Sequence, residues 1–145
     1  MAALGQSRLP VVMPHYPHMM REDTAIWTKF LQTTKTKIKE VWYDVHCGQA
    51  VVPNVGATDI ERRVSAGVTR KRIDVVAAVG GGVWVIEIKP YANMFALGQI
   101  RTYVRLLSKE YALPGEAVPV IICNNVDPDI LEDIDDFGIL VITVS

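Results

Sequence analysis

The chain has 145 residues, of which 50% are hydrophobic and 21% charged, and its formal net charge is −1. This composition is typical of one soluble globular domain and excludes a disordered or fibrous chain. No apolar run reaches the roughly 18 to 20 residues that span a bilayer, and the N-terminus lacks the pattern of a signal peptide, so we expect a cytoplasmic protein with no membrane partner.

Basic and acidic residues separate along the chain. Residues 1–111 contain all 15 Lys and Arg residues and nine of the 16 acids, which gives this part a formal charge of +6. The last 34 residues contain seven acids and no basic residue. A basic body of this kind can bind a polyanion, although two solvated faces of opposite sign would give the same pattern.

The first part of the chain predicts an arm, a helix and a strand. Residues 1–20 contain three prolines and no usable periodicity, which indicates an irregular N-terminal arm ahead of one domain over residues 21–145. His15 and His18 in this arm could ligate a metal together, but no Cys, Asp or Glu stands beside them. Apolar residues at steps of three and four predict a helix over 21–39. The stretch VWYDVHCGQAVV, residues 41–52, predicts a strand bent by a glycine.

The second part alternates strands and helices. Residues 53–72 combine turn residues with five basic side chains between Arg62 and Arg72. The predicted elements that follow are a hairpin over 73–90, a helix over 93–111, a strand over 118–123, a short acidic helix over 128–137 and a last strand over 138–145. This order predicts an α/β fold with a mixed sheet flanked by helices. The two cysteines, Cys47 and Cys123, lie in strand-like stretches and predict buried free thiols.

The hairpin IDVVAAVGGGVWVIEIKP carries two acids and a lysine among apolar residues. With a two-residue turn at Gly80-Gly81, the numbers of each facing pair sum to 161, so Asp74 faces Glu87. A three-residue turn would offset the two acids by one position. Lys89 lies two residues after Glu87 and therefore shares its face of the strand. The hairpin thus predicts two carboxylates and an ammonium group at one end of two neighbouring strands.

Two neighbouring carboxylates repel each other and resist burial, so they need a cation or a shared proton. A hard divalent cation such as Mg2+, for which Mn2+ can substitute, prefers oxygen ligands and would satisfy both acids. Lys89 beside it could orient the attacking water or stabilise charge on a phosphate, which suits phosphodiester hydrolysis. A simple salt bridge at a strand end, with Lys89 neutralising one of the acids, would give the same spacing.

Asp74, Glu87 and Lys89, on two adjacent strands between a first and a second helix, resemble the PD-(D/E)XK nuclease superfamily. The restriction-endonuclease-like αβββαβ core of that family matches the expected order over residues 21 to about 123, and the acidic helix and last strand are additions. Ile73 stands where the family's motif has a proline before the aspartate.

The resemblance implies a role for each matching residue. Asp74, Glu87 and the carbonyl of Ile88 would hold the metal, and Lys89 would position the water. An acid on the first helix often joins such a site; Glu22 is the first candidate and Asp23 the second, although Glu22 could merely complement the helix dipole. The family also carries a glutamine on the second helix, where this chain has Gln99 with Tyr103 one turn later, and both could instead be polar residues at the edge of the helix.

Two groups of basic residues could contact nucleic acid, since phosphates are held mainly by Lys and Arg. Arg70, Lys71 and Arg72 lead directly into Asp74, and Arg101, Arg105 and Lys109 recur every four residues on the second helix. Each group alone could be a solvated surface. Because no base-reading motif is visible, we expect recognition of structure or ends rather than of sequence.

The leading hypothesis is therefore a metal-dependent endonuclease that hydrolyses DNA. The size of the chain is similar to that of stand-alone Holliday-junction resolvases and of phage or mobile-element nucleases, which would act in the host cytoplasm or travel in a virion. A resolvase would need a symmetric homodimer to cut two strands. The alternative is a nuclease-like fold that serves as a nucleic-acid-binding or structural component, with partners in a phage particle or a DNA-processing assembly.

Overall fold

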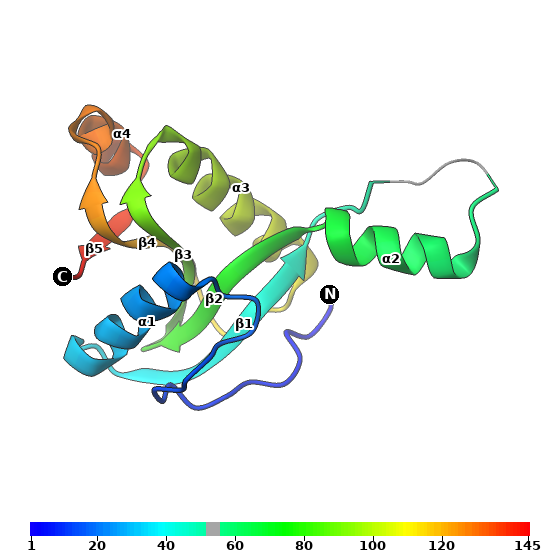
Figure 1. Cartoon of the computed structure of the whole chain (residues 1–145), viewed down its shortest axis with the longest axis horizontal. Helices are drawn as coiled ribbons and strands as arrows, with labels where there is room; N and C mark the ends of the chain where they lie inside the picture. Colours follow the sequence, from blue (N-terminus) through cyan, green and yellow to red (C-terminus); the bar gives the residue numbers. More distant parts are fainter. Residues whose placement is uncertain (52–55) are drawn as a thin grey trace.

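The computed structural model describes residues 1–51 and 56–145. Its helices and strands follow the predicted order with one additional helix, α2 (Figure 1). In chain order they are α1 (Arg21–Thr33), β1 (Ile38–Cys47), α2 (Asp59–Thr69), β2 (Lys71–Val79), β3 (Gly82–Ala92), α3 (Met94–Glu110), β4 (Ala117–Val126), the 3-10 turn η1 (Pro128–Ile130), α4 (Leu131–Asp136) and β5 (Leu140–Thr143).

The strands form one mixed sheet in the order β1-β2-β3-β4-β5. β1, β2 and β3 are antiparallel neighbours, whereas β3, β4 and β5 run parallel. The parallel pairs are joined through α3 and through η1 with α4, as parallel strands require a crossover connection. The predicted α/β fold with a mixed sheet flanked by helices is therefore confirmed.

The register of the β2–β3 hairpin is the predicted one. Val79 pairs with Gly82 and Val75 pairs with Ile86, so a two-residue turn joins the strands. Gly80 in this turn has a φ of 58°, a left-handed conformation that favours glycine. The register puts Asp74 level with Glu87, as the sequence predicts.

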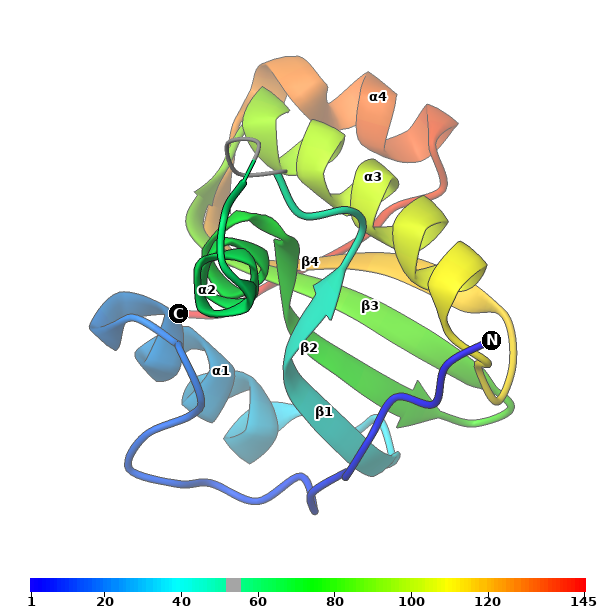
Figure 2. The same cartoon turned by 90° about the vertical axis from the view of Figure 1, so that its right-hand side faces the viewer.

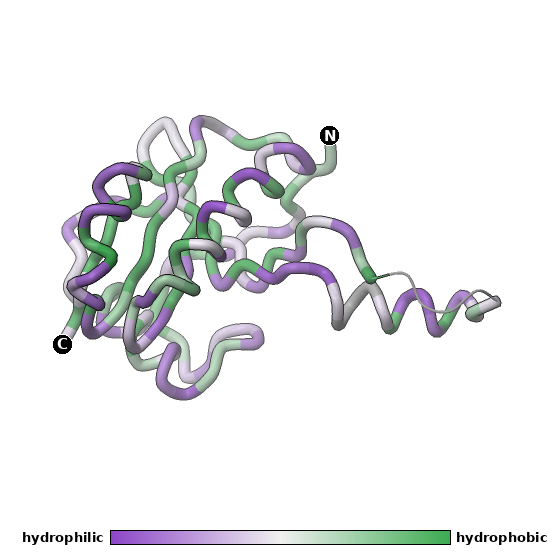
Figure 3. The backbone as a smooth tube through the Cα atoms, turned by 90° about the horizontal axis from the view of Figure 1, so that it is seen from above, coloured by the Kyte–Doolittle hydropathy of each residue, from purple (hydrophilic) through white to green (hydrophobic). Residues whose placement is uncertain are grey.

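Two apolar layers cover the two faces of the sheet, with α1 on one side and α3 on the other (Figure 2). On the α1 side, Trp27 and Phe30 pack against strand residues that include Ile86 and Ile88. On the α3 side, Leu97 and Ile100 belong to the cluster that covers the opposite face of the sheet, in which η1 and α4 also take part. Hydrophobic residues accordingly gather along the strands (Figure 3). The buried Cys47 and Cys123 are free thiols, as predicted.

The first helix is shorter than the sequence predicts. It ends at Thr33 instead of Lys39, and β1 begins at Ile38. The backbone N–H of Thr34 donates the last helical bond, to Phe30, and the Thr34 hydroxyl then accepts from the N–H of Thr36. Threonine favours such local bonds and loses side-chain freedom in a helix, so this run of threonines ends it. The predicted strand ends at Cys47, and its last residue, 52, lies outside the described residues together with 53–55.

Helix α2 lies within residues 53–72, for which the sequence predicts turns and a basic segment. Thr58 and Glu61 form a capping box: the backbone N–H of Glu61 donates to the Thr58 hydroxyl at 3.1 Å, and that of Thr58 donates to the Glu61 carboxylate at 3.2 Å. Its apolar residues Ile60 and Val64 are exposed instead of buried. The helix projects away from the sheet (Figure 1) and carries both hydrophobic and hydrophilic residues (Figure 3).

The N-terminal arm runs along the outer side of β1 (Figure 2). Arg8 and Val41 exchange two backbone hydrogen bonds, and the Trp42 indole N–H donates to the carbonyl of Gly5 at 3.1 Å. The division into an arm and one domain over 21–145 remains a prediction. Among the described residues, no helix combines the length and the apolar character needed to cross a membrane.

Candidate active site

The sheet opens between β2 and β3 at the position of the two predicted acids. The β2–β3 ladder ends at the pair Val75 and Ile86, whereas β3 stays paired with β4 as far as Ala92. Asp74 and Glu87 are the first residues beyond that last pair. Strands that separate in this way leave backbone groups without ladder partners, which a ligand or a side chain can then bind.

The Asp74 carboxylate occupies part of this opening. Its Oδ2 accepts a hydrogen bond of 2.8 Å from the backbone N–H of Ile88. In an extended strand, the N–H and the C=O of one residue lie along the same edge. The carbonyl of Ile88 therefore points toward the same opening as its N–H. Burial is the main cause that raises the pKa of Asp74, and the bond from Ile88 and the charge of Lys89 oppose it.

Glu87 is a buried carboxylate without a full set of partners. The residue is 5% exposed, and its Oε2 has no hydrogen-bond partner. Its Oε1 lies 3.7 Å from the Lys89 ammonium, whose side chain reaches partly into solvent. Burial, followed by the negative charge of Asp74, raises the pKa of Glu87 well above its ordinary value, although Lys89 opposes this. The pair of acids therefore retains a proton more readily than isolated carboxylates do.

The donor set fits a hard divalent cation in part. Asp74, Glu87 and the carbonyl of Ile88 offer oxygen ligands, and the unpartnered Oε2 is a buried acceptor that a cation would satisfy. Within residues 1–51 and 56–145, no group of three or more His, Cys, Asp or Glu side chains gathers closely enough to hold a metal. Such a cation would consequently keep several waters, which suits Mg2+.

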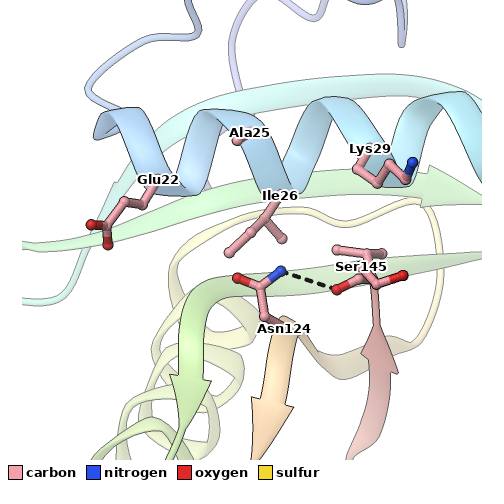
Figure 4. A pocket seen from close by; sticks show the side chains of 7 residues that line it. Glu22, Ala25, Ile26, Lys29, Asn124 and Ser145 are labelled. Atoms are coloured by element: carbon pink, nitrogen blue, oxygen red, sulfur yellow. Dashed lines mark hydrogen bonds between the residues drawn. The ribbon is translucent and has the colours of Figure 1, made fainter.

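Of the two predicted acids on α1, Asp23 is the one that interacts with this opening. Its charge acts on Asp74 and Glu87, and the Lys89 ammonium acts on Asp23 in turn. Burial raises the pKa of Asp23. Glu22 instead lines a separate hollow with Lys29 on α1 and Asn124 on β4, where the Asn124 amide donates to the carbonyl of Val144 (Figure 4).

Gln99 and Tyr103 on α3 border the same opening. The Gln99 Oε1 is buried without a hydrogen-bond partner. Burial raises the pKa of Tyr103 to about 12, and the negative charges of Glu87 and Asp74 add to this effect. The Tyr103 phenol therefore senses the two carboxylates and stays neutral at neutral pH, and Gln99, which lines the same hollow as Tyr103, offers a neutral amide beside it.

Two of the residues predicted to contact phosphates form ion pairs within the protein. Arg70 binds both carboxylate oxygens of Glu110, at 2.5 and 2.7 Å, and donates to the carbonyl of Gly48. Arg72 binds both oxygens of Asp44 at 2.9 Å. Because each arginine contacts both oxygens of a carboxylate, its guanidinium group is fixed in place. Arg70 thereby connects the start of β2 to α3, and Arg72 connects β2 to β1.

The other predicted phosphate contacts are exposed. Lys71 at the start of β2 and three residues of α3 extend into solvent: Arg101, Arg105 and Lys109. The Arg101 guanidinium lies 3.8 Å over the ring of Phe137, a contact that orients it without neutralising its charge. These four side chains are therefore free to meet a polyanion.

Asp44 is a residue near the site that the sequence pattern does not single out. Its backbone has a φ of 52°, and by the β1–β2 register it lies level with Asp74. His18 and His46 approach its Oδ2 at 3.5 and 3.4 Å, beside Arg72. The one available signal was an acid in the middle of an otherwise apolar and aromatic strand. His18 thus contacts a carboxylate, and no described cluster includes it with His15 as a metal site.

Comparisons with known proteins give only distant similarity in fold. No protein-family model matches the sequence, and no curated protein matches it. A repair endonuclease from Pyrococcus abyssi is similar at 20% identity with a TM-score of 0.46, over 51% of this chain and 33% of that one. A protein of unknown function, AF1548, is similar at 16% identity with a TM-score of 0.45, over 79% and 52% of the two chains.

The protein VC1899 from Vibrio cholerae is similar at 15% identity with a TM-score of 0.46, over 83% of this chain and 30% of that one. This chain thus spans between about a third and about half of the length of the three proteins. At these identities and TM-scores, the similarity transfers no function to this chain.

Proposed function

We propose that the chain is a metal-dependent endonuclease of the PD-(D/E)XK type that hydrolyses DNA phosphodiester bonds. The observation that carries the proposal is the pair Asp74 and Glu87 at the opening of the sheet, with a buried carboxylate oxygen that lacks a partner and Lys89 beside it. A purely structural salt bridge would leave no reason to bury that unsatisfied oxygen, because an unpaired buried polar atom costs free energy.

Asp74, Glu87 and the Ile88 carbonyl would hold Mg2+, or Mn2+ in its place. When bound, the cation would supply charge stabilisation for the phosphate and lower the pKa of an attacking water. The two carboxylates would give up their shared proton and remain ionised. Lys89 keeps an ammonium donor near Glu87 and could direct it at the attacking water or at a phosphate oxygen.

Gln99 and Tyr103 would complete the chemistry from the α3 side. The free Oε1 of Gln99 can accept a hydrogen bond from a water that enters the opening. Tyr103 stays protonated at neutral pH because its pKa is raised to about 12. Asp23, on which the charge of Lys89 acts, would help to hold that ammonium group near the opening.

The exposed basic side chains support DNA as the substrate and favour backbone contacts. Lys71, Arg101, Arg105 and Lys109 present four cationic groups on β2 and α3. Contacts of this type fix position on nucleic acid without reading sequence. We therefore propose that the enzyme recognises the structure of its substrate, such as a branch, nick or end.

Cleavage assays test this proposal directly. Labelled linear, nicked, flapped and four-way DNA would be incubated with Mg2+ or Mn2+ and with a chelator. We expect cutting that requires the metal and that falls by about 10³-fold or more in Glu87→Gln and Lys89→Ala. Glu116→Gln, at an exposed residue between α3 and β4, is the matched control and should cut normally. Undiminished cutting by Glu87→Gln would remove these residues from the active site.

A second function is favoured by one observation on the arm. Leu9, Val11 and Val12 expose 69%, 52% and 49% of their surface, which suits contact with another protein. In that case the fold would serve as a component of a phage particle or a DNA-processing assembly. A wild-type protein that cuts no substrate with either metal, but forms a stoichiometric complex through the arm, would support this alternative.

A further inference from the structure

The outer face of α3 contains a glycine that the fold itself does not need. Gly98 lies in the helix interior, is exposed, and does not have a positive φ. A Cβ atom built at this position would meet no other atom within 4 Å. Glycine is unfavourable inside a helix compared with alanine, so neither backbone conformation nor packing explains its presence.

The missing side chain leaves a hollow in the helix surface. Gly98, Arg101, Thr102 and Arg105 line a space of about 380 Å³, and they recur at steps of three and four residues on one face of α3. Two guanidinium groups and a hydroxyl therefore surround a bare stretch of backbone. Each of these groups can donate hydrogen bonds to a phosphate oxygen.

A second hollow continues the first toward the candidate active site. It is lined by Lys71, Gly98, Gln99, Thr102 and Tyr103, and its volume is about 310 Å³. The two hollows share Gly98 and Thr102, so together they form one trough across α3. One end of the trough has Arg105, and the other has Lys71 with the two residues that border Asp74 and Glu87.

The surroundings limit what the trough can hold. Arg101 is fixed over the ring of Phe137, next to α4, whose exposed acids are Glu132, Asp133, Asp135 and Asp136. A polyanion is therefore attracted along the trough and repelled from α4. The hollow between Arg101 and Arg105 is lined mainly by polar and cationic groups around bare backbone, which suits the phosphodiester backbone of a single strand better than an apolar peptide.

We propose that this trough binds the phosphate backbone of the DNA strand to be cut, and that Gly98 allows the DNA backbone to approach helix α3. The trough, a seat for the bound strand, is formed by Lys71, Gly98, Arg101, Thr102 and Arg105. That the bound strand is cut rests on the proposed nuclease function. That a strand binds in the trough rests on the geometry of α3 alone. It adds Gly98 and Thr102 to the basic residues that the sequence predicts.

Binding measurements separate the seat from the chemistry. Fluorescence anisotropy of labelled single-stranded and duplex DNA would be measured without divalent metal, in full-length wild type, Gly98→Ala, Gly98→Leu and Gly98→Glu. Leucine fills the hollow with a neutral side chain that favours a helix, and alanine adds one carbon where there is space. We expect Gly98→Ala to weaken affinity by about three- to fivefold, because its methyl group stands where the phosphate backbone would approach, and the two larger substitutions to weaken it by about tenfold or more.

The salt dependence gives a second readout. Lys71→Ala and Arg105→Ala should each lower the slope of log affinity against log salt by about one unit if they contact phosphates. Lys35→Ala is the charge-matched control, because Lys35 is exposed in the segment between α1 and β1. It should leave the slope unchanged. Unfolding curves of all variants would confirm that each one folds.

The outcomes distinguish this inference from the proposed function. Weakened binding in Gly98→Leu with no cutting by wild type would support the seat and refute the nuclease. Metal-dependent cutting and binding that are both normal in Gly98→Leu and Gly98→Glu would support the nuclease and overturn the seat. Absence of any DNA binding by the wild type would overturn the seat as well.

Discussion

The carboxylate of Glu87 occupies an unfavourable position in the fold. A carboxyl group that is 5% exposed, next to a second acid, loses hydration and gains repulsion when it ionises. A group whose pKa is raised in the folded state stabilises the fold below its ordinary pKa, and that contribution is lost as pH rises through the folded-state pKa. The metal-free protein should therefore lose stability between about pH 3.8 and 6 because of Asp74, and between about pH 4.5 and 9 because of Glu87.

Glu87→Gln should remove part of this cost. Between the ordinary pKa of 4.5 and the folded-state pKa of about 9, each unit of rising pH lowers the stability by up to about 1.4 kcal/mol. Because a buried amide also needs partners, we expect a gain of about 1–3 kcal/mol at pH 8 and little change at pH 4. Denaturant unfolding in a chelator at both pH values measures the gain. If Glu87→Gln is no more stable than wild type at pH 8, Glu87 is not held as a strained carboxylate.

Asp44 behaves in the opposite way. Burial alone would raise its pKa, but the two-pronged bond from Arg72 and the charges of Arg72, His18 and His46 lower it overall. An acid with a lowered pKa contributes stability above its ordinary value, near 3.8, and that contribution is lost as pH falls through the folded-state pKa.

Arg72→Gln should therefore destabilise the protein at neutral pH by about 1 kcal/mol, discounted for the partial exposure of the arginine. The difference from wild type should shrink as unfolding is measured at pH values progressively below 3.8, because Asp44 takes up a proton as pH falls through its lowered folded-state pKa. A difference that is equally large at pH 3 and pH 7 would show that packing, and not the ion pair, is what Arg72 supplies.

At the scale of elements, α2 is held by its own cap rather than by the core. Ile60 and Val64 are 70% and 60% exposed, so burial contributes little to this helix. The Thr58–Glu61 capping box satisfies two of its first amides. Thr58→Ala should lower local stability by about 1 kcal/mol and speed amide exchange in residues 59–65. Hydrogen exchange by mass spectrometry measures this effect.

The midpoint of global unfolding should stay unchanged in Thr58→Ala, because α2 contributes no residue to either apolar cluster that the structure describes. Thr36→Ala, which lies in the loop before β1, is the matched control and should leave exchange in α2 as it is. A lower midpoint in Thr58→Ala would mean that α2 packs on the body in solution.

Helix α2 is the element that the sequence pattern did not predict. Hydrophobic periodicity detects a helix through its buried face, and in α2 the apolar side chains that the structure describes, Ile60 and Val64, are exposed, so the T-x-x-E cap is the signal in its sequence. The β2–β3 register, by contrast, follows from the turn glycines and the alternation of strand residues, and these features alone suffice to place Asp74 level with Glu87. Which α1 acid faces the opening depends on the rotation of the helix, and a one-residue ambiguity separates Asp23 from Glu22.

At the scale of the whole molecule, the charges that separate along the sequence lie close together in space. Ile130 of η1 and Ile134 of α4 belong to the same apolar cluster as α3, and the Arg101 guanidinium of α3 lies over Phe137 at the end of the acidic helix α4. The acidic unit therefore lowers the positive potential beside the proposed substrate seat. Screening at 0.1 M salt acts over about 10 Å, so the effect belongs to low ionic strength.

Replacing the four exposed acids of α4 by their amides should raise affinity for DNA by several fold at low salt. The change comprises Glu132→Gln, Asp133→Asn, Asp135→Asn and Asp136→Asn. The gain should disappear as salt increases, because it has no geometric origin. Anisotropy titrations at two salt concentrations measure it. An affinity that does not depend on these acids at low salt would place bound DNA away from α3.

The arm that pairs with Val41 has a consequence for how copies of this protein meet. A sheet with free outer strands can extend from one molecule into the next, and natural proteins prevent this by covering or shortening those strands. Here the arm partly covers the edge strand β1, and the other edge strand, β5, has only four residues. Neither edge strand therefore pairs readily with a strand of another molecule. Self-association, if the protein assembles, would therefore proceed through helices and loops, and the sheets of neighbouring molecules would stay separate.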